Sequence, residues 1–231
     1  MLWIHAGPHK AASSYVTERL RKNRTTLAKQ RVLMDGDNNL LANSIAEKNY
    51  QPLEQALSGL SGDFQRILIS SSSLDTRILK RDVLTVLREM ASSYGFKLGI
   101  SYFIRDQQSW LNSVYCHRVR RFRSTQDFPN YCRYIMNNSS SWDISYPSKF
   151  SPLKDYPEIV KMFLPLSRQV EVTDPFLALT SALDLKEPQG IGWLKGEPSK
   201  KNIQPGAKGI WMSRICYQLM ESLGFDPDVL N

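Results

Sequence analysis

The sequence predicts an α/β fold of three layers, in which helices cover both faces of a central parallel β-sheet. Short apolar runs typical of buried strands alternate along the chain with longer segments of helical periodicity, and this alternation favours a parallel sheet. Hydrophobic residues make up 42% of the 231 residues, which is enough to build one buried core, and no internal repeat is evident. We therefore expect a single domain over residues 1–231.

Each expected element follows from its local pattern. Short apolar runs predict strands over residues 1–6, 66–70, 97–104 and 169–173. Apolar residues at helical spacing predict helices over 12–29, 52–60, 75–94, 107–121, 126–137, 156–163, 175–185 and 207–223. The polar stretches 31–50 and 138–158 are expected to be loops, the first with some helix and the second as a lid over a substrate.

Composition excludes several classes of protein and points to an anionic partner. The net charge is +8, which favours binding of a nucleotide, a nucleic acid or an acidic surface. The three cysteines form no C-x-x-C pair, so neither a disulfide framework nor a structural zinc site is expected. The sequence has no run of 18 apolar residues and no signal-peptide pattern, so we expect a cytoplasmic protein without a membrane partner.

The first candidate site joins the first strand to the first helix. The segment reads Gly7-Pro8-His9-Lys10-Ala11-Ala12-Ser13-Ser14. Backbone amides and a helix N-terminus at such a turn bind anions, and Lys10 adds a cation. An ordinary strand–helix turn with a surface lysine is the alternative. The segment is not a Walker A loop, because no glycine stands directly before the lysine. It is not the dinucleotide-binding pattern G-x-G-x-x-G either, because it contains only Gly7.

Two further motifs are expected at the same edge of the sheet, where ligands of open α/β folds bind. Arg105 follows the third strand, and its guanidinium can bind a phosphate with two hydrogen bonds. Ser113 lies eight residues later in the next helix and could return to the same anion. The late basic segment Lys200-Lys201-Asn202 could close over a nucleotide, or it could be a solvated loop.

Together these motifs resemble the sulfotransferases that use 3′-phosphoadenosine 5′-phosphosulfate (PAPS). The family's phosphosulfate loop, G-x-x-K-[TS]-[GA]-[TS]-[TS], is matched by Gly7, Lys10, Ala12, Ser13 and Ser14, whereas Ala11 replaces a hydroxyl residue. The family's 3′-phosphate motif, an Arg after a strand and a Ser eight residues later, is similar to Arg105 and Ser113. The segments Ile67–Ser71 and Lys201–Ile203 are similar to small bacterial sulfotransferases, including the cyanobacterial type. The resemblance spans about residues 1–120 and 195–222.

The resemblance implies a P-loop-like version of the fold and a role for each motif. Lys10 would offset charge on the departing 3′,5′-adenosine bisphosphate (PAP), and the backbone of residues 8–14 with Ser13 and Ser14 would hold the 5′-phosphate. Arg105 and Ser113 would hold the 3′-phosphate. PAPS would be the co-substrate and PAP the by-product, with no metal ion. Sulfuryl transfer depends mostly on positioning and charge stabilisation, as phosphoryl transfer does.

The general base is the open question. Bacterial relatives often carry a Ser-Ser-Glu pattern, but this chain reads Ser70-Ser71-Ser72-Ser73-Leu74-Asp75. Histidine is the residue best suited to proton transfer near neutral pH. His9 and His117 are equal candidates, His5 is expected in the core, and Asp75 and Asp35 rank next. The acceptor is expected to be a hydroxyl or amine of a small molecule, as in natural-product biosynthesis.

Two other classes of function compete with this interpretation. A nucleotide-dependent kinase on a P-loop-like fold would need ATP, magnesium and a carboxylate to hold the ion. A nucleic-acid-binding domain would use the arginines at 118, 120, 121 and 123, and its binding would fall steeply with salt. We favour a solvated helix end with partial contact to the nucleotide for these arginines, and expect no nucleic-acid partner. A homodimer is the oligomer we would expect, since it is the commonest one.

Overall fold

The computed structural model describes residues 1–8, 10–36, 39–60, 64–121, 123–138, 145–166, 174–195 and 206–223. The chain divides into two compact units. The first unit comprises Met1–Arg105 and Lys149–Pro198, and the second comprises Asp106–Ser148 and Ser199–Asn231. Whether the two make one sulfotransferase-like domain stays a prediction, and each is described by itself.

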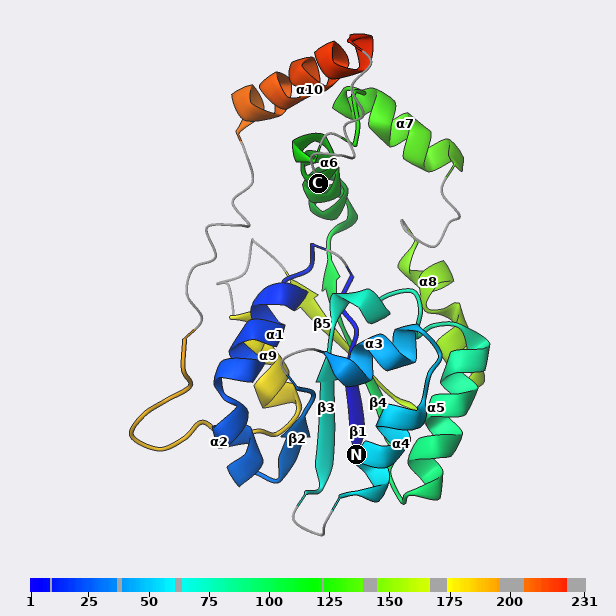
Figure 1. Cartoon of the computed structure of the whole chain (residues 1–231), viewed down its shortest axis with the longest axis vertical. Coiled ribbons are helices and arrows are strands. Elements are labelled where there is room, and N and C mark those ends of the chain that lie inside the picture. Colours follow the sequence, from blue (N-terminus) through cyan, green and yellow to red (C-terminus); the bar gives the residue numbers. More distant parts are fainter. Residues whose placement is uncertain are drawn as a thin grey trace. The chain divides into compact units, whose positions relative to one another are not determined.

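The first unit contains a five-stranded parallel sheet, which confirms the predicted fold class. The strands follow the order β2-β3-β1-β4-β5 (Figure 1). They are β1 (Leu2–His5), β2 (Val32–Met34), β3 (Arg66–Ser70), β4 (Leu98–Arg105) and β5 (Val160–Leu166). β1 lies in the middle, and the chain passes from one side of it to the other between β3 and β4. Such a switch point is where open parallel sheets bind ligands.

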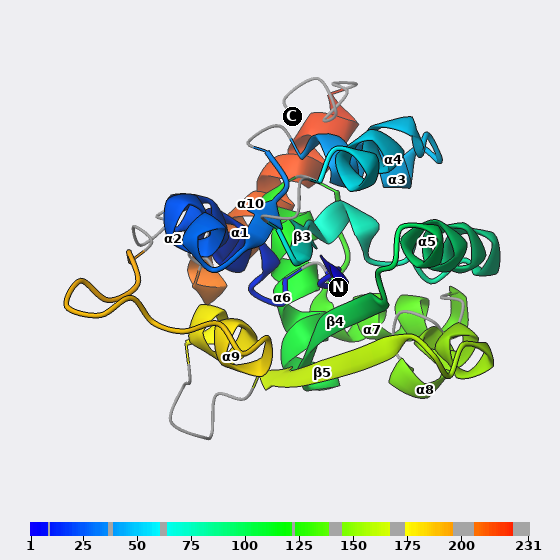
Figure 2. The same cartoon turned by 90° about the horizontal axis from the view of Figure 1, so that it is seen from below.

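Helices cover both faces of this sheet (Figures 1 and 2). One face carries α1 (Ser13–Lys22), α2 (Arg24–Lys29) and α9 (Pro175–Ala182). The other carries α3 (Leu40–Ala46), α4 (Gln51–Ser58) and α5 (Arg81–Ser93). The first unit also contains two short 3₁₀ helices, η1 (Ser72–Leu74) and η2 (Ser151–Asp155). The short helix α8 (Tyr146–Lys149) spans the sequence boundary between the two units, which lies between Ser148 and Lys149.

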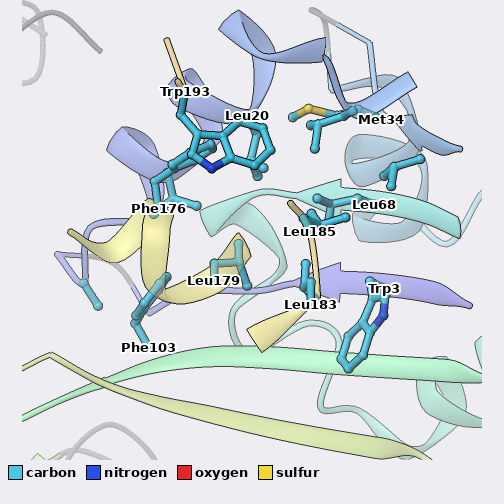
Figure 3. Close-up of a cluster of buried hydrophobic side chains, with 14 residues drawn as sticks. Trp3, Leu20, Met34, Leu68, Phe103, Phe176, Leu179, Leu183, Leu185 and Trp193 are labelled. Atoms are coloured by element: carbon cyan, nitrogen blue, oxygen red, sulfur yellow. The ribbon is translucent and has the colours of Figure 1, made fainter. Parts of the chain in front are cut away.

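The main hydrophobic cluster lies between the sheet and the α1 side. Figure 3 shows Leu20 of α1, Phe176 of α9 and Trp193 gathered on one side of the strands. Trp193 is 7% exposed and packs edge-on against Phe176 with ring centroids 5.3 Å apart. It therefore anchors the loop after α9 in the core.

The second unit is helical and has a smaller core. It contains α6 (Gln107–Arg120), α7 (Phe128–Asn138) and α10 (Ala207–Ser222). Its buried side chains are Tyr115, Cys116, Val119 and Tyr131. α10 packs on α6 and has no buried residue along its length. In the part of the chain that is described, no helix is both long and apolar enough to cross a membrane.

Several expected elements need correction. The predicted helix 156–163 is wrong, because β5 occupies Val160–Leu166 and pairs with β4 along seven residues. The expected loop 31–50 contains the short strand β2, which the three-residue pattern was too brief to reveal. The helix expected over 75–94 begins only at Arg81. The expected helix 12–29 is interrupted at Asn23, whose side chain bonds to the backbone of Arg19 and Leu194.

Part of the expected loop 138–158 is ordered as α8 and η2, while residues 139–144 lie outside the described residues. The predicted strand 169–173 lies outside them as well. The remaining predicted strands and helices agree with the structure to within a few residues at their ends.

Candidate anion-binding site

The loop between β1 and α1 leaves the centre of the sheet at the carboxyl end of the strands. Gly7 and Pro8 are buried, and the amide of Ala11 donates a hydrogen bond to the carbonyl of Pro8 at 3.1 Å. Lys10 and Ala12 have φ angles of 69° and 61°. This left-handed region costs a residue with a side chain about 1–2 kcal/mol, so the loop holds strained backbone at two positions.

Ala11, which replaces the hydroxyl residue of the sulfotransferase pattern, is 1% exposed and belongs to the main hydrophobic cluster. Its side chain therefore faces the core and not the mouth of the loop. The family pattern has a hydroxyl residue at this position, whereas in this chain the position lies in an apolar environment.

The N-terminus of α1 is open to an anion. Ala12 occupies the N-cap position and supplies no side-chain cap, and the first turn has no acidic residue. Backbone amides at such an end, with the helix dipole, favour a negatively charged ligand. Of the two serines that begin the helix, Ser14 is exposed, whereas Ser13 is 4% exposed.

Arg105 ends β4 and reaches the same loop. Its Nη1 donates a hydrogen bond to the backbone carbonyl of Lys10 at 3.1 Å. Both side chains are half-buried. The structure thus brings together two motifs that stand 95 residues apart in the sequence, and it places the Arg105 guanidinium on the backbone of the loop that leads into α1.

A row of polar side chains crosses the three central strands below the loop. His5 of β1 is in register with Ser70 of β3 and with Ser101 of β4. His5 Nδ1 lies 2.8 Å from Ser70 Oγ, which lies 2.7 Å from Thr17 Oγ1 of α1. His5 is fully buried, and its burial lowers the pKa of the imidazole from 6.5 to about 4. The histidine is therefore neutral at physiological pH.

Sequence reasoning missed this row as a functional feature. His5 was expected only as a packed core group, and Ser70 only as part of a resemblance. A signal was present, because each of the three predicted central strands carries a His or Ser after an apolar run. The strand register was needed to show that these residues align.

Further polar contacts fix α1 against the rest of the first unit. Arg19 is 3% exposed and forms an ion pair with Asp174, which also accepts the Phe176 amide at the start of α9. The Arg19 guanidinium lies 4.2 Å from the centroid of the Phe176 ring. Tyr15 Oη donates to the same carboxylate at 2.9 Å. The helix that would receive the anion is therefore held in place by a buried ion pair.

The other predicted site residues are not all brought to this loop. Ser113 and His117 are half-buried on α6 of the second unit, one helical turn apart. Their approach to the anion site stays a prediction. His9, Lys200, Lys201 and Asn202 lie outside the described residues.

Two carboxylates considered as bases are already engaged. Asp35 accepts the amides of Leu41 and Ala42 at 3.1 and 3.0 Å and so caps α3. Asp75 lies 2.6 Å from the ammonium of Lys149, which is buried. Asp35 is thus used as a helix cap and Asp75 as the partner of a buried cation, so a structural role accounts for each of these two carboxylates.

The arginines at the end of α6 contribute to a different feature. Arg118 and Arg123 line a pocket of about 200 Å³ within the second unit, together with Tyr131, Tyr134 and Tyr217. Among the described residues, no group of three or more His, Cys, Asp or Glu side chains is placed to hold a metal ion.

The loop's donor set fits a phosphate or sulfate group. It combines an uncapped helix N-terminus, the Arg105 guanidinium on the loop backbone and the exposed hydroxyl of Ser14. No protein-family model matches the chain, and a search of the curated proteins finds no match.

Proposed function

We propose that this protein is a PAPS-dependent sulfotransferase, which transfers a sulfuryl group to a hydroxyl or amine of a small-molecule acceptor. The observation that carries the proposal is the hydrogen bond from Arg105 to the Lys10 carbonyl, beside the uncapped N-terminus of α1. This arrangement places the Arg105 guanidinium on the loop that carries Lys10 and that leads into the N-terminal end of the α1 helix dipole. The motif order in the sequence supports PAPS over other nucleotides.

Each residue has a role in the proposed reaction. The amides at the start of α1 and the Ser14 hydroxyl bind the 5′-phosphosulfate, and Arg105 with Ser113 binds the 3′-phosphate. Lys10 offsets the negative charge that develops on the oxygen between phosphorus and sulfur as the sulfur–oxygen bond breaks. The acceptor oxygen or nitrogen forms the new bond to sulfur and gives up its proton to a base, for which His9 and His117 remain the candidates.

The first experiment is a titration with PAP in the absence of metal, followed through the thermal midpoint of unfolding. A ligand that binds the folded state raises this midpoint. We expect PAP to raise it and AMP, which lacks the 3′-phosphate, to raise it much less. No shift with PAP, together with a magnesium-dependent shift with ATP, would replace the sulfotransferase proposal by the kinase.

Two variants make the titration specific to the site. Arg105→Ala should remove most of the PAP shift and leave the weak AMP response. Arg88→Ala is the matched control, because Arg88 lies beside Lys97 and Leu98 at the opposite end of β4, where it forms exposed ion pairs and lies over the Tyr156 ring. Lys10→Ala should then nearly abolish sulfuryl transfer from PAPS in an acceptor screen.

The identity of the acceptor, a cytoplasmic location and a homodimer are parts of the same proposal. They depend on the sulfotransferase assignment and are tested after it.

A further inference from the structure

Two buried polar atoms face the space beside Gly7 without hydrogen-bond partners among the described residues. They are His5 Nε2 and Ser13 Oγ, on side chains that are 0% and 4% exposed. Buried polar atoms are normally paired, and an unpaired one costs about 1–3 kcal/mol. Two such atoms next to a candidate ligand loop therefore call for a functional explanation.

Counting hydrogens restricts the role of each side of the imidazole. Thr17 Oγ1 can donate its single proton to the Ser70 carbonyl at 3.3 Å. Two proton arrangements fit the remaining contacts. If Thr17 Oγ1 donates to Ser70 Oγ instead, Ser70 Oγ donates to His5 Nδ1 and the proton of the imidazole is on Nε2. If the bond to the carbonyl is kept, the Ser70 hydroxyl donates to Thr17 Oγ1 and His5 Nδ1 donates to Ser70 Oγ. In this second arrangement, each hydroxyl and imidazole proton of the His5–Ser70–Thr17 network has an acceptor. Nε2 is left with a lone pair that points out of the network.

Gly7 provides the space in which that lone pair and the Ser13 hydroxyl can meet. A Cβ atom on Gly7 would overlap Ser13 Oγ and would stand 3.4 Å from His5 Nε2. The φ angle of Gly7 is not in the left-handed region, so its lack of a side chain is required by space and not by backbone conformation. Both orphan atoms thus border the same small volume.

We propose that His5 is a positioning residue of the anion site, and that its neutral imidazole accepts the Ser13 hydroxyl proton at Nε2. A rotation about the Ser13 Cα–Cβ bond makes this hydrogen bond and satisfies both atoms at once. Ser13 then anchors the first turn of α1 to the central strand. Of the serine pair, Ser14 is left to contact the ligand directly.

This division of work deepens the proposed function, because it assigns different tasks to two serines that the sequence treats alike. Its binding consequences rest on that proposed function. The hydrogen bond itself does not, since we propose it for the protein without ligand. The two parts can therefore be tested separately.

The hydrogen bond is tested by a double-mutant cycle on stability, with His5→Asn, Ser13→Ala and the double variant in urea. Asn keeps an amide near the position of Nδ1 for Ser70 but has no group at the position of Nε2. We expect a coupling of about 5-fold in the unfolding equilibrium constant, the equivalent of about 1 kcal/mol. The matched cycle of His5→Asn with Ser14→Ala should be additive. Additivity in the first cycle would overturn the proposal.

A second measurement works on the wild-type protein and needs no variant to fold. The nitrogen-15 chemical shifts of the His5 ring at pH 7 should show a protonated Nδ1 and an unprotonated Nε2. The opposite tautomer would leave Nε2 unable to accept the Ser13 proton, and it would overturn the proposal.

The positioning role is tested by PAP affinity. Ser13→Ala and His5→Asn should weaken PAP binding to the same extent, with no further loss in the double variant, and His5→Gln should restore part of it through its amide oxygen. If Ser13 were instead a direct ligand, Ser13→Ala would still weaken binding in the His5→Asn protein. Absence of PAP binding to the wild type would refute the proposed function, while the stability cycle would still decide the hydrogen bond.

Discussion

α1 and α6 both begin where a central strand ends, but their N-termini are built differently. α1 follows β1 through a loop with Ala12 at the N-cap and has no side-chain cap. α6 follows β4 directly, and Asp106 Oδ1 accepts the Ser109 amide at 2.7 Å. A carboxylate at the first turn satisfies an amide there and repels anions. The comparison shows that only the first of these two helix ends is available to a negative ligand.

The two helices also differ in how their first turns are fixed. α1 buries Ser13, Val16 and Thr17 from its first residue onward. In α6 the buried residues begin only at Tyr115, in the second half of the helix. Packing therefore fixes the start of α1, while a local cap fixes the start of α6. A binding site needs the first kind of support, because its amides must stay free for the ligand.

The largest effect is expected from removing the ion pair that holds α1. Asp174→Ala leaves the Arg19 guanidinium buried and without its carboxylate, which typically costs about 3–5 kcal/mol. Urea unfolding monitored by circular dichroism measures the loss.

The control lies on the same helix. Lys22 and Glu18 form an exposed pair at 3.5 Å, so Lys22→Ala should cost no more than about 0.5 kcal/mol. Equal losses for the two variants would mean that α1 is not held by its buried pair.

A second effect follows from the buried histidine. The pKa of His5 is about 4 in the folded protein and 6.5 in the unfolded chain. Between these values the unfolded chain binds a proton that folded His5 does not bind. The free energy of unfolding should therefore fall as pH is lowered from about 6.5 to about 4, by about 3 kcal/mol in total.

Among the residues that the structure describes, the side chains around His5 do not titrate in this range. They are Ser13 and Thr17 of α1, Ser70 of β3, and Ser101 and Phe103 of β4. The measurement is stability against pH for the wild type and for His5→Asn, whose difference isolates His5 from the carboxylates elsewhere. Parallel curves for the two proteins would contradict the prediction.

A smaller effect is expected at the start of α6. Asp106→Ala removes a side-chain cap and should destabilise the protein by about 1 kcal/mol, whereas Asp106→Asn should retain most of the cap. Chemical unfolding of both variants tests this. If both variants lose the same free energy of unfolding, the charge of Asp106 stabilises the helix and its hydrogen bond does not.

The sequence was sufficient for the main features of the first unit. Alternating strands and helices predicted the parallel sheet, and the rule that ligands meet the carboxyl ends of strands predicted that Arg105 and Lys10 would converge. The helix expected at 156–163 was wrong because its apolar residues suit either element. Residues 160–166 form a strand because they pair with β4, which is distant in the sequence.

The details of the site needed three-dimensional information. The left-handed backbone at Ala12 and the burial of Ser13 beside the exposed Ser14 leave no mark in the sequence motif. The alignment of His5 with Ser70 and Ser101 depends on strand register. The division into two units has no clear sequence signal either, since no linker-like segment separates Arg105 from Asp106.

The smallest change in stability tests the comparison of the two helices most directly, because it brings a carboxylate to the start of α1, as Asp106 does at the N-cap of α6. Ser14→Asp places a carboxylate at the exposed second residue of α1, where it should stabilise the helix by about 0.3–1 kcal/mol. The same charge should weaken PAP binding by about 10-fold or more, since it occupies the space of the anion and repels it. Ser14→Asn is the matched control, with similar size and no charge.

Stability and affinity should therefore change in opposite directions in the Asp variant alone, as expected if this helix end is left uncapped to bind an anion. An Asp variant that binds PAP as tightly as the Asn variant would show that the anion does not lie at the N-terminus of α1.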